Sequence, residues 1–171
     1  LAAVVALALG GGVVFALTAP PTDVYPAVLI GLAALSLSLG TATTLRRAAL
    51  LAWLFATVAA LVGMRFIPSV VQRFTGLGWA GGVGALLLLA AGQAGAWGIG
   101  GALVGFLRRR VGPAPSLAFG AGVFIAIVPS LVIAWTPAGV ITPWPALVQL
   151  GEIVGERGVS FLFAVAAFFS P

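Results

Sequence analysis

Two of the three carboxylates that could serve a catalytic or binding site lie near the C-terminal end of this sequence. Glu152, Glu156 and Arg157 are close together there, after a long stretch of apolar residues. On a continuous helix, Gln149, Glu152, Glu156 and Ser160 would share one face. Two carboxylates beside a guanidinium predict either a polar binding or active site, or an ion-paired helix end at a membrane surface.

The composition excludes most kinds of active site. The chain has no His, no Cys and no Lys, so it lacks an imidazole base, a thiolate nucleophile and the usual transition-metal ligands. Its only acids are Asp23, Glu152 and Glu156, too few for a proton relay or a paired-aspartate protease. We therefore expect no cofactor and no metal, and the C-terminal polar stripe cannot be a complete active site.

The balance of apolar and charged residues indicates an integral membrane protein. The 171 residues are 62% hydrophobic and 6% charged, with a mean hydropathy of +1.25, whereas a soluble domain is roughly a quarter charged. A net charge of +5 and a pI near 11.8 could indicate a nucleic-acid partner. The arginines stand at the ends of apolar runs, however, so we interpret them as determinants of membrane topology and expect no nucleic-acid binding.

The lengths of the apolar runs predict an all-α, polytopic bundle of transmembrane helices. A helix needs about 20 apolar residues to cross a bilayer. About six runs approach that length, at residues 1–19, 27–45, 48–64, 79–107, 116–135 and 158–170, the last of them truncated. Residues 65–78 are too polar and broken to span, so they are expected to form a loop or a shallow re-entrant segment. Both ends of the chain suggest a fragment of a longer protein.

Two of the predicted spans have internal features. In residues 79–107, small residues recur at every fourth position, which favours close helix packing rather than a ligand site. Gln93 is the one clearly polar side chain of that span, and we expect it to bond to a neighbouring segment. Pro129 predicts a kink in the last third of residues 116–135.

The arginines also predict an orientation. Five of them, Arg46, Arg47, Arg108, Arg109 and Arg110, follow the second and fourth runs. The excess of positive charge on cytoplasmic loops then places the N-terminus in the cytoplasm. Residues Pro20–Pro26 and Thr136–Arg157 would lie on the extracytoplasmic side, with several irregular segments gathered on that face.

Three segments in this order resemble the apolipoprotein N-acyltransferases. They are Ala19–Ala27 with its Pro-Pro turn and Tyr-Pro pair, Phe74–Gly78, and Pro145–Gly155 running on into Val159. The resemblance covers essentially the whole chain. It implies an enzyme of the bacterial cytoplasmic (inner) membrane that moves an acyl chain from a phospholipid to the N-terminal cysteine of a lipoprotein. The implied partners are a phospholipid acyl donor, a lipoprotein acceptor and membrane lipids.

The family's catalytic residues are absent from this chain. They are a Glu, a Lys and a Cys of a nitrilase-like domain, which the resemblance implies would follow Pro171. The chain then corresponds to the N-terminal membrane domain, which would supply a lipid-facing groove. The Phe-Pro-Trp arm typical of the family has its nearest counterpart at Trp135, without the preceding proline. Together with Glu152 and Arg157, Trp135 is a predicted substrate-binding residue.

Two other classes of function remain open from the residues alone. Glycine-rich helices, a Pro-containing span and a polar stripe are also compatible with one half of a transporter or permease. The scarcity of charged residues at mid-membrane depth argues against that alternative. A structural or assembly subunit of a membrane complex is the third possibility.

Overall fold

The protein is an α-helical bundle, as predicted. The computed structural model describes residues 2–111, 115–129, 133, 135–141 and 144–169, and this part of the chain contains no strand. The helices, in chain order, are α1 (Ala2–Ala16), α2 (Ala27–Gly40), α3 (Leu45–Gly63), α4 (Ile67–Thr75), α5 (Trp79–Val111), α6 (Pro115–Ile127), the short 3₁₀ helix η1 (Gly139–Ile141) and α7 (Pro145–Phe168).

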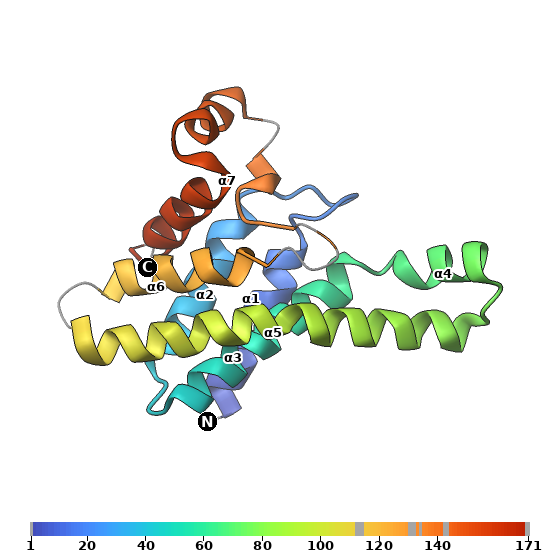
Figure 1. Ribbon diagram of the computed structural model, residues 1–171, viewed down its shortest axis with the longest axis horizontal. Coiled ribbons are helices and arrows are strands. Elements are labelled where there is room, and N and C mark those ends of the chain that lie inside the picture. Colours follow the sequence, from blue (N-terminus) through green and yellow to red (C-terminus); the bar gives the residue numbers. More distant parts are fainter. Residues whose placement is uncertain (1, 112–114, 130–132, 134, 142–143, 170–171) are drawn as a thin grey trace.

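The bundle is organised around α5 (Figure 1). This helix packs against α3 on one side and α6 on another, while α1 packs on α2 and α3, and α7 packs on α6 and α2. The largest fully buried side chains, Phe15, Phe55 and Phe119, come from α1, α3 and α6. Because α1, α2 and α6 are apolar on all sides, no polar face directs these helices toward water, as is typical of membrane proteins.

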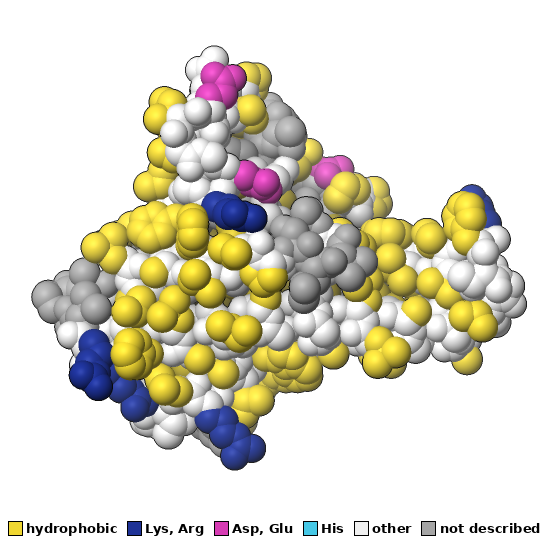
Figure 2. All heavy atoms as spheres, viewed as in Figure 1, with side chains coloured by type: hydrophobic (Ala, Val, Ile, Leu, Met, Phe, Trp, Pro, Cys, Tyr) yellow, Lys and Arg dark blue, Asp and Glu magenta, His cyan; other side chains and the backbone are white. Residues whose placement is uncertain are grey.

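The lengths and surfaces of the helices fit a bilayer. Helices α3 and α5 are long and apolar enough to cross one, whereas α1, α2 and α6 are shorter apolar helices. Large apolar side chains are exposed on the outside of the bundle, including Ile30 (61% exposed) and Leu88 (78%). Figure 2 shows hydrophobic side chains spread over much of the visible face. Such a surface is suited to contact with lipid.

Close packing between α3 and α5 depends on small residues, as the sequence predicted. A Cβ atom at Gly101 would lie 2.6 Å from the Ala48 carbonyl oxygen and 2.6 Å from the Ala52 Cβ. One turn further on, a Cβ at Gly105 would lie 3.2 Å from the Ala48 Cβ. At Gly101 and Gly105, the small-residue stripe of α5 is therefore filled by the backbone and side chains of α3.

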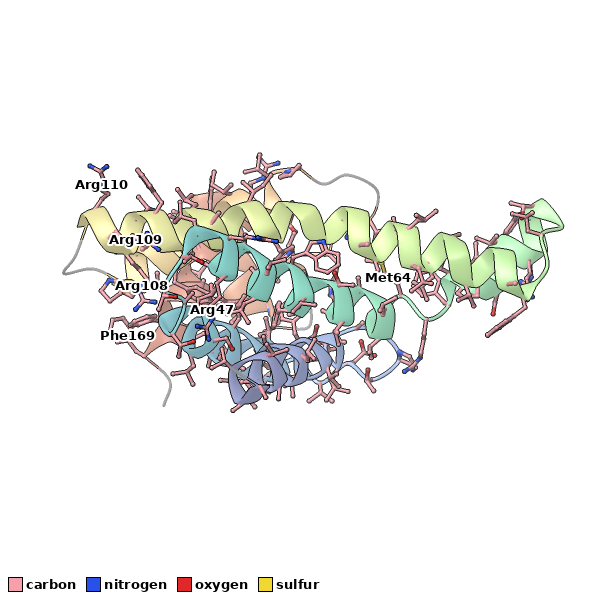
Figure 3. All side chains as sticks on the ribbon, turned by 90° about the horizontal axis from the view of Figure 1, so that it is seen from below. Arg47, Met64, Arg108, Arg109, Arg110 and Phe169 are labelled. Atoms are coloured by element: carbon pink, nitrogen blue, oxygen red, sulfur yellow. The ribbon has the colours of Figure 1, made fainter. Side chains whose placement is uncertain are left out.

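The segment between the third and fourth runs was predicted to be a loop or a shallow re-entrant segment. Most of it is helical, so the loop is excluded. Helix α4 begins with Pro68 in its first turn and ends at Gly76, which has φ 69°. Proline is compatible with the first turn of a helix, and glycine adopts the left-handed conformation that ends one. Helix α4 packs against the N-terminal part of α5, and the two project from the bundle as an arm (Figures 1 and 3).

Two helices near the C-terminus differ in extent from the predicted spans. Helix α6 ends at Ile127, before Pro129, because proline lacks the N–H that the next helical hydrogen bond needs. A kink within a continued span is therefore replaced by a helix end; residues 130–132 and 134 lie outside the described part. Helix α7 begins at Pro145 and is broken at Gly155, whose φ of 72° and ψ of 165° are not helical.

Candidate functional site

The bundle has two ends of different character. We call one the arginine end; it carries Arg46 and Arg47 at the start of α3 and Arg108, Arg109 and Arg110 at the end of α5. Figure 3 labels Arg47 and the three arginines of α5 at this end. We call the other the loop end; it contains the α1–α2 turn, residues 135–141 and all three acids. The irregular segments meet there, since the Tyr25 ring lies 6.1 Å from the Trp144 ring.

Four aromatic rings surround a hollow at the loop end, between α1, α3 and α5. The Phe15 ring is central, with ring centroids 5.6 Å from Phe55, 6.0 Å from Trp97 and 5.2 Å from Trp135. The rings are tilted or edge-on to one another, which is the favourable geometry for aromatic pairs. Gln93 and small residues of α3 and α5 complete the lining. The hollow is thus apolar, apart from one amide.

That amide holds the segment after α6 in place. Gln93 Nε2 donates to the Ile133 carbonyl at 2.9 Å, and the Ile133 N–H donates to Gln93 Oε1 at 3.4 Å. The expectation that Gln93 bonds to a neighbouring segment is confirmed. Because both ends of the amide are used, Gln93 acts on the site by positioning the chain that leads to Trp135.

Trp135 lines two adjacent hollows, together with Gln93 and Trp97. The first lies among the aromatic rings, and the second is lined by residues of α6, Pro129, Ile133 and Thr136. The indole rests on Gly63 at the end of α3, where an added Cβ would lie 2.6 Å from Trp135 Cη2. The absence of a side chain at Gly63 therefore creates the space that the half-buried indole occupies.

Half of the predicted polar stripe has a structural role that sequence reasoning missed. Thr136 Oγ1 donates to Glu156 Oε1 and accepts from the Gly139 N–H at 3.0 Å. One turn further along α7, the buried Ser160 Oγ accepts from the Ala138 N–H at 3.0 Å. Glu156 and Ser160 do share a face, as predicted, and that face binds the loop carrying Trp135. The i, i+4 spacing of Glu156 and Ser160 indicated a shared helix face. It did not indicate that this face would bind the loop at Thr136 and Ala138.

The other half of the stripe does not lie on that face, so the prediction of one continuous polar face is wrong. The non-helical Gly155 separates Gln149 and Glu152 from Glu156 and Ser160. The first half of α7 stands away from the bundle in Figure 1, and Glu152 is exposed on it. Glycine adopts such a positive φ easily because it has no side chain. The pattern of hydrophobic residues therefore does not indicate the interruption of the helix at Gly155.

The side chain of Arg157, a residue of α7, reaches the C-terminal end of α6. Its Nη2 donates to the Val128 carbonyl at 3.2 Å, where a cation also complements the negative end of the helix dipole. All three predicted site residues, Trp135, Glu152 and Arg157, belong to the loop end. The structure describes no direct bond among them, and Arg157 is joined to α6 rather than to Glu152.

Comparison with known proteins supports the family suggested by the residues. No curated protein matches the chain. The sequence model described as the apolipoprotein N-acyltransferase N-terminal domain matches residues 11–169, which is well over half of the 171 residues. With its helical bundle and its two helices of membrane-spanning length, this chain belongs to the apolipoprotein N-acyltransferase N-terminal domain family.

Proposed function

We propose that this chain is the membrane domain of an enzyme that transfers an acyl chain from a phospholipid to the N-terminal cysteine of lipoproteins. The family match over residues 11–169 is the observation that carries the proposal. The chain has no Cys, Lys or His, so the covalent chemistry belongs to a separate catalytic domain. The role of this chain is to hold the donor lipid below that domain.

We propose that the acyl chain of the donor lies against the aromatic lining of the hollow at the loop end. Its lining of Phe15, Phe55, Trp97 and Trp135 matches the apolar character of an acyl chain. The bonds from Gln93 to Ile133 and from α7 to Thr136 and Ala138 fix the loop that carries Trp135. In this proposal Trp135 contacts the acyl chain. Glu152 and Arg157 bind the headgroup or the lipoprotein at the mouth of the aromatic hollow.

An acyl-transfer assay tests the function. The natural protein that contains this chain is reconstituted into vesicles whose phospholipid carries a labelled acyl chain, with a lipopeptide bearing a free N-terminal cysteine amine. The expected product contains a new amide bond at that amine, and the phospholipid loses one ester bond to leave a lysophospholipid. Absence of both labelled amide and lysophospholipid, in vesicles that contain folded protein, would contradict the proposal.

Removing the Glu152 carboxylate is expected to reduce acyl transfer at least about tenfold, the scale of one charge-assisted hydrogen bond. Glu152 is exposed and bears no described packing, so Glu152→Ala should insert into the membrane normally. Gln149→Ala is the matched control, since Gln149 is also exposed on the first half of α7. Equal activity of Glu152→Ala and the control, at equal membrane abundance, would remove Glu152 from the site.

The proposed location is the bacterial cytoplasmic membrane, with the loop end outside. This chain contains no Cys, so single cysteines at its exposed positions give a clean test once the cysteine of the separate catalytic domain has been replaced by serine. Val24→Cys, in the α1–α2 turn, is expected to react with a membrane-impermeant maleimide in intact spheroplasts. Thr43→Cys, at the arginine end, is expected to react only after lysis. The reverse labelling pattern would show the opposite orientation.

A further inference from the structure

A groove lies on the outside of the bundle and begins at the arginine end. It is distinct from the aromatic hollow. It is lined by Arg46, Ala49, Leu50, Trp53 and Gly98, and it encloses about 600 Å³ counted to its open side. The first four are spaced i, i+3, i+4 and i+7 along α3, so they form one face of that helix. Gly98 of α5 leaves room between the two helices.

The floor of this groove is held in one orientation. The Trp53 indole Nε1 donates to the Ala91 carbonyl of α5 at 3.0 Å, so its one polar atom is satisfied. A Cβ at Gly98 would lie 3.6 Å from the Trp53 Cβ and 3.5 Å from the Ala49 carbonyl, which is ordinary contact. Apart from Arg46 at its head, the groove therefore offers an apolar and preformed surface.

The charge at the head of the groove is not neutralised by the protein. Arg108 and Arg109 donate to the carbonyls of Leu39 and Thr43, and Arg110 lies over the Phe106 ring. Arg46 is exposed and, within the described residues, has no hydrogen-bond or ion-pair partner. All three acids of the chain belong to the loop end, so the arginine end presents five cations without a carboxylate.

We propose that this groove binds an anionic phospholipid, with its phosphate on Arg46 and one acyl chain along Ala49, Trp53 and Gly98. Helix α3 begins at Leu45 and is long enough to span, so Arg46 lies one residue inside the end of the span, at headgroup depth. A guanidinium binds phosphate through two parallel hydrogen bonds. This lipid is not the proposed acyl donor, because its headgroup lies at the arginine end, opposite the loop end.

The binding of defined lipids tests the proposal. The natural protein is purified in detergent, stripped of lipid and titrated with phosphatidylglycerol or phosphatidylcholine of identical acyl chains, and bound lipid is counted by native mass spectrometry. Brominated acyl chains of the same lipids report contact through quenching of Trp53, isolated by comparison with Trp53→Phe. We expect phosphatidylglycerol to bind at least about tenfold more tightly than phosphatidylcholine. Equal binding of the two lipids would overturn the proposal.

Two variants separate the headgroup contact from the groove. Arg46→Gln removes the charge from an exposed side chain, and Gly98→Leu fills the groove; each is expected to weaken phosphatidylglycerol binding about tenfold. The matched controls are Arg73→Gln on α4 and Gly92→Leu, an exposed position of α5 with open space around it. The milder Gly98→Ala checks that the helices still pack. Unchanged phosphatidylglycerol binding by Arg46→Gln would overturn the assignment, whatever Gly98→Leu does.

Discussion

Replacing Gly100 by alanine is expected to lower the free energy of unfolding by about 3 kcal/mol, the upper part of the usual range for overpacking a core. An added Cβ would lie 2.3 Å from the Gly122 carbonyl oxygen and 3.1 Å from the Ala126 Cβ. The first of these contacts is with the backbone of α6, so no side-chain rotation can relieve it. Helix α6 would have to move away from α5, and its contacts with Val104 would loosen.

The matched control is Gly95→Ala on the same helix. A Cβ at Gly95 would meet no atom within 4 Å, so alanine there should be neutral or stabilise by roughly 0.5–1 kcal/mol through its better helix propensity. The measurement is reversible unfolding in mixed detergent micelles, followed by circular dichroism. If the two alanine variants unfolded at the same denaturant concentration, the close α5–α6 crossing would be contradicted.

Replacing Trp135 by alanine is expected to reduce acyl transfer by about tenfold to a hundredfold. The indole packs on Phe15 and Gly63 and lines both hollows at the loop end. Its removal would take away the ring against which the acyl chain is proposed to lie. A displacement of about 1 Å in a bound substrate can reduce the rate a hundredfold. The assay is the transfer of a labelled acyl chain by the natural protein in vesicles.

Gly63→Ala provides an independent test of the same role. It leaves the indole present but forces it to move, because the new Cβ would lie 2.6 Å from Trp135 Cη2. We expect a smaller loss of activity, in the same direction. Trp79→Ala is the control, since Trp79 is 68% exposed at the start of α5. Full activity of Trp135→Ala would contradict only the proposed contact of Trp135 with the acyl chain. An inactive wild-type protein would contradict the proposed function itself.

The structure changes the meaning of the polar residues near the C-terminus. Periodicity predicted one polar face, but Gly155 divides α7, so Glu156 and Ser160 bind the loop while Glu152 faces outward. Arg157 bonds to the end of α6 at Val128. Three of these four side chains thus have local structural partners, whereas no bond of Glu152 is described.

The class of protein, the helical bundle and the absence of a thiolate or an imidazole could be predicted from the sequence alone. These properties depend on composition and on the lengths of apolar runs. Both can be read along the chain without knowing which segments are in contact. It also predicted the packing of the α5 glycines, because the spacing of small residues is a local pattern. The family resemblance belonged to this level too, and the match over residues 11–169 confirmed it.

Which residues meet could not be predicted and became clear from the three-dimensional structure. The aromatic hollow joins Phe15, Phe55, Trp97 and Trp135 from four separate segments. The groove beside Arg46 likewise exists only where α3 crosses α5. In an almost uniformly apolar chain, the sequence pattern does not indicate which face of a helix turns inward. Contacts between distant segments are therefore set by shape, through glycines that admit a neighbouring ring or backbone, and by single polar bonds such as that from Gln93 to Ile133.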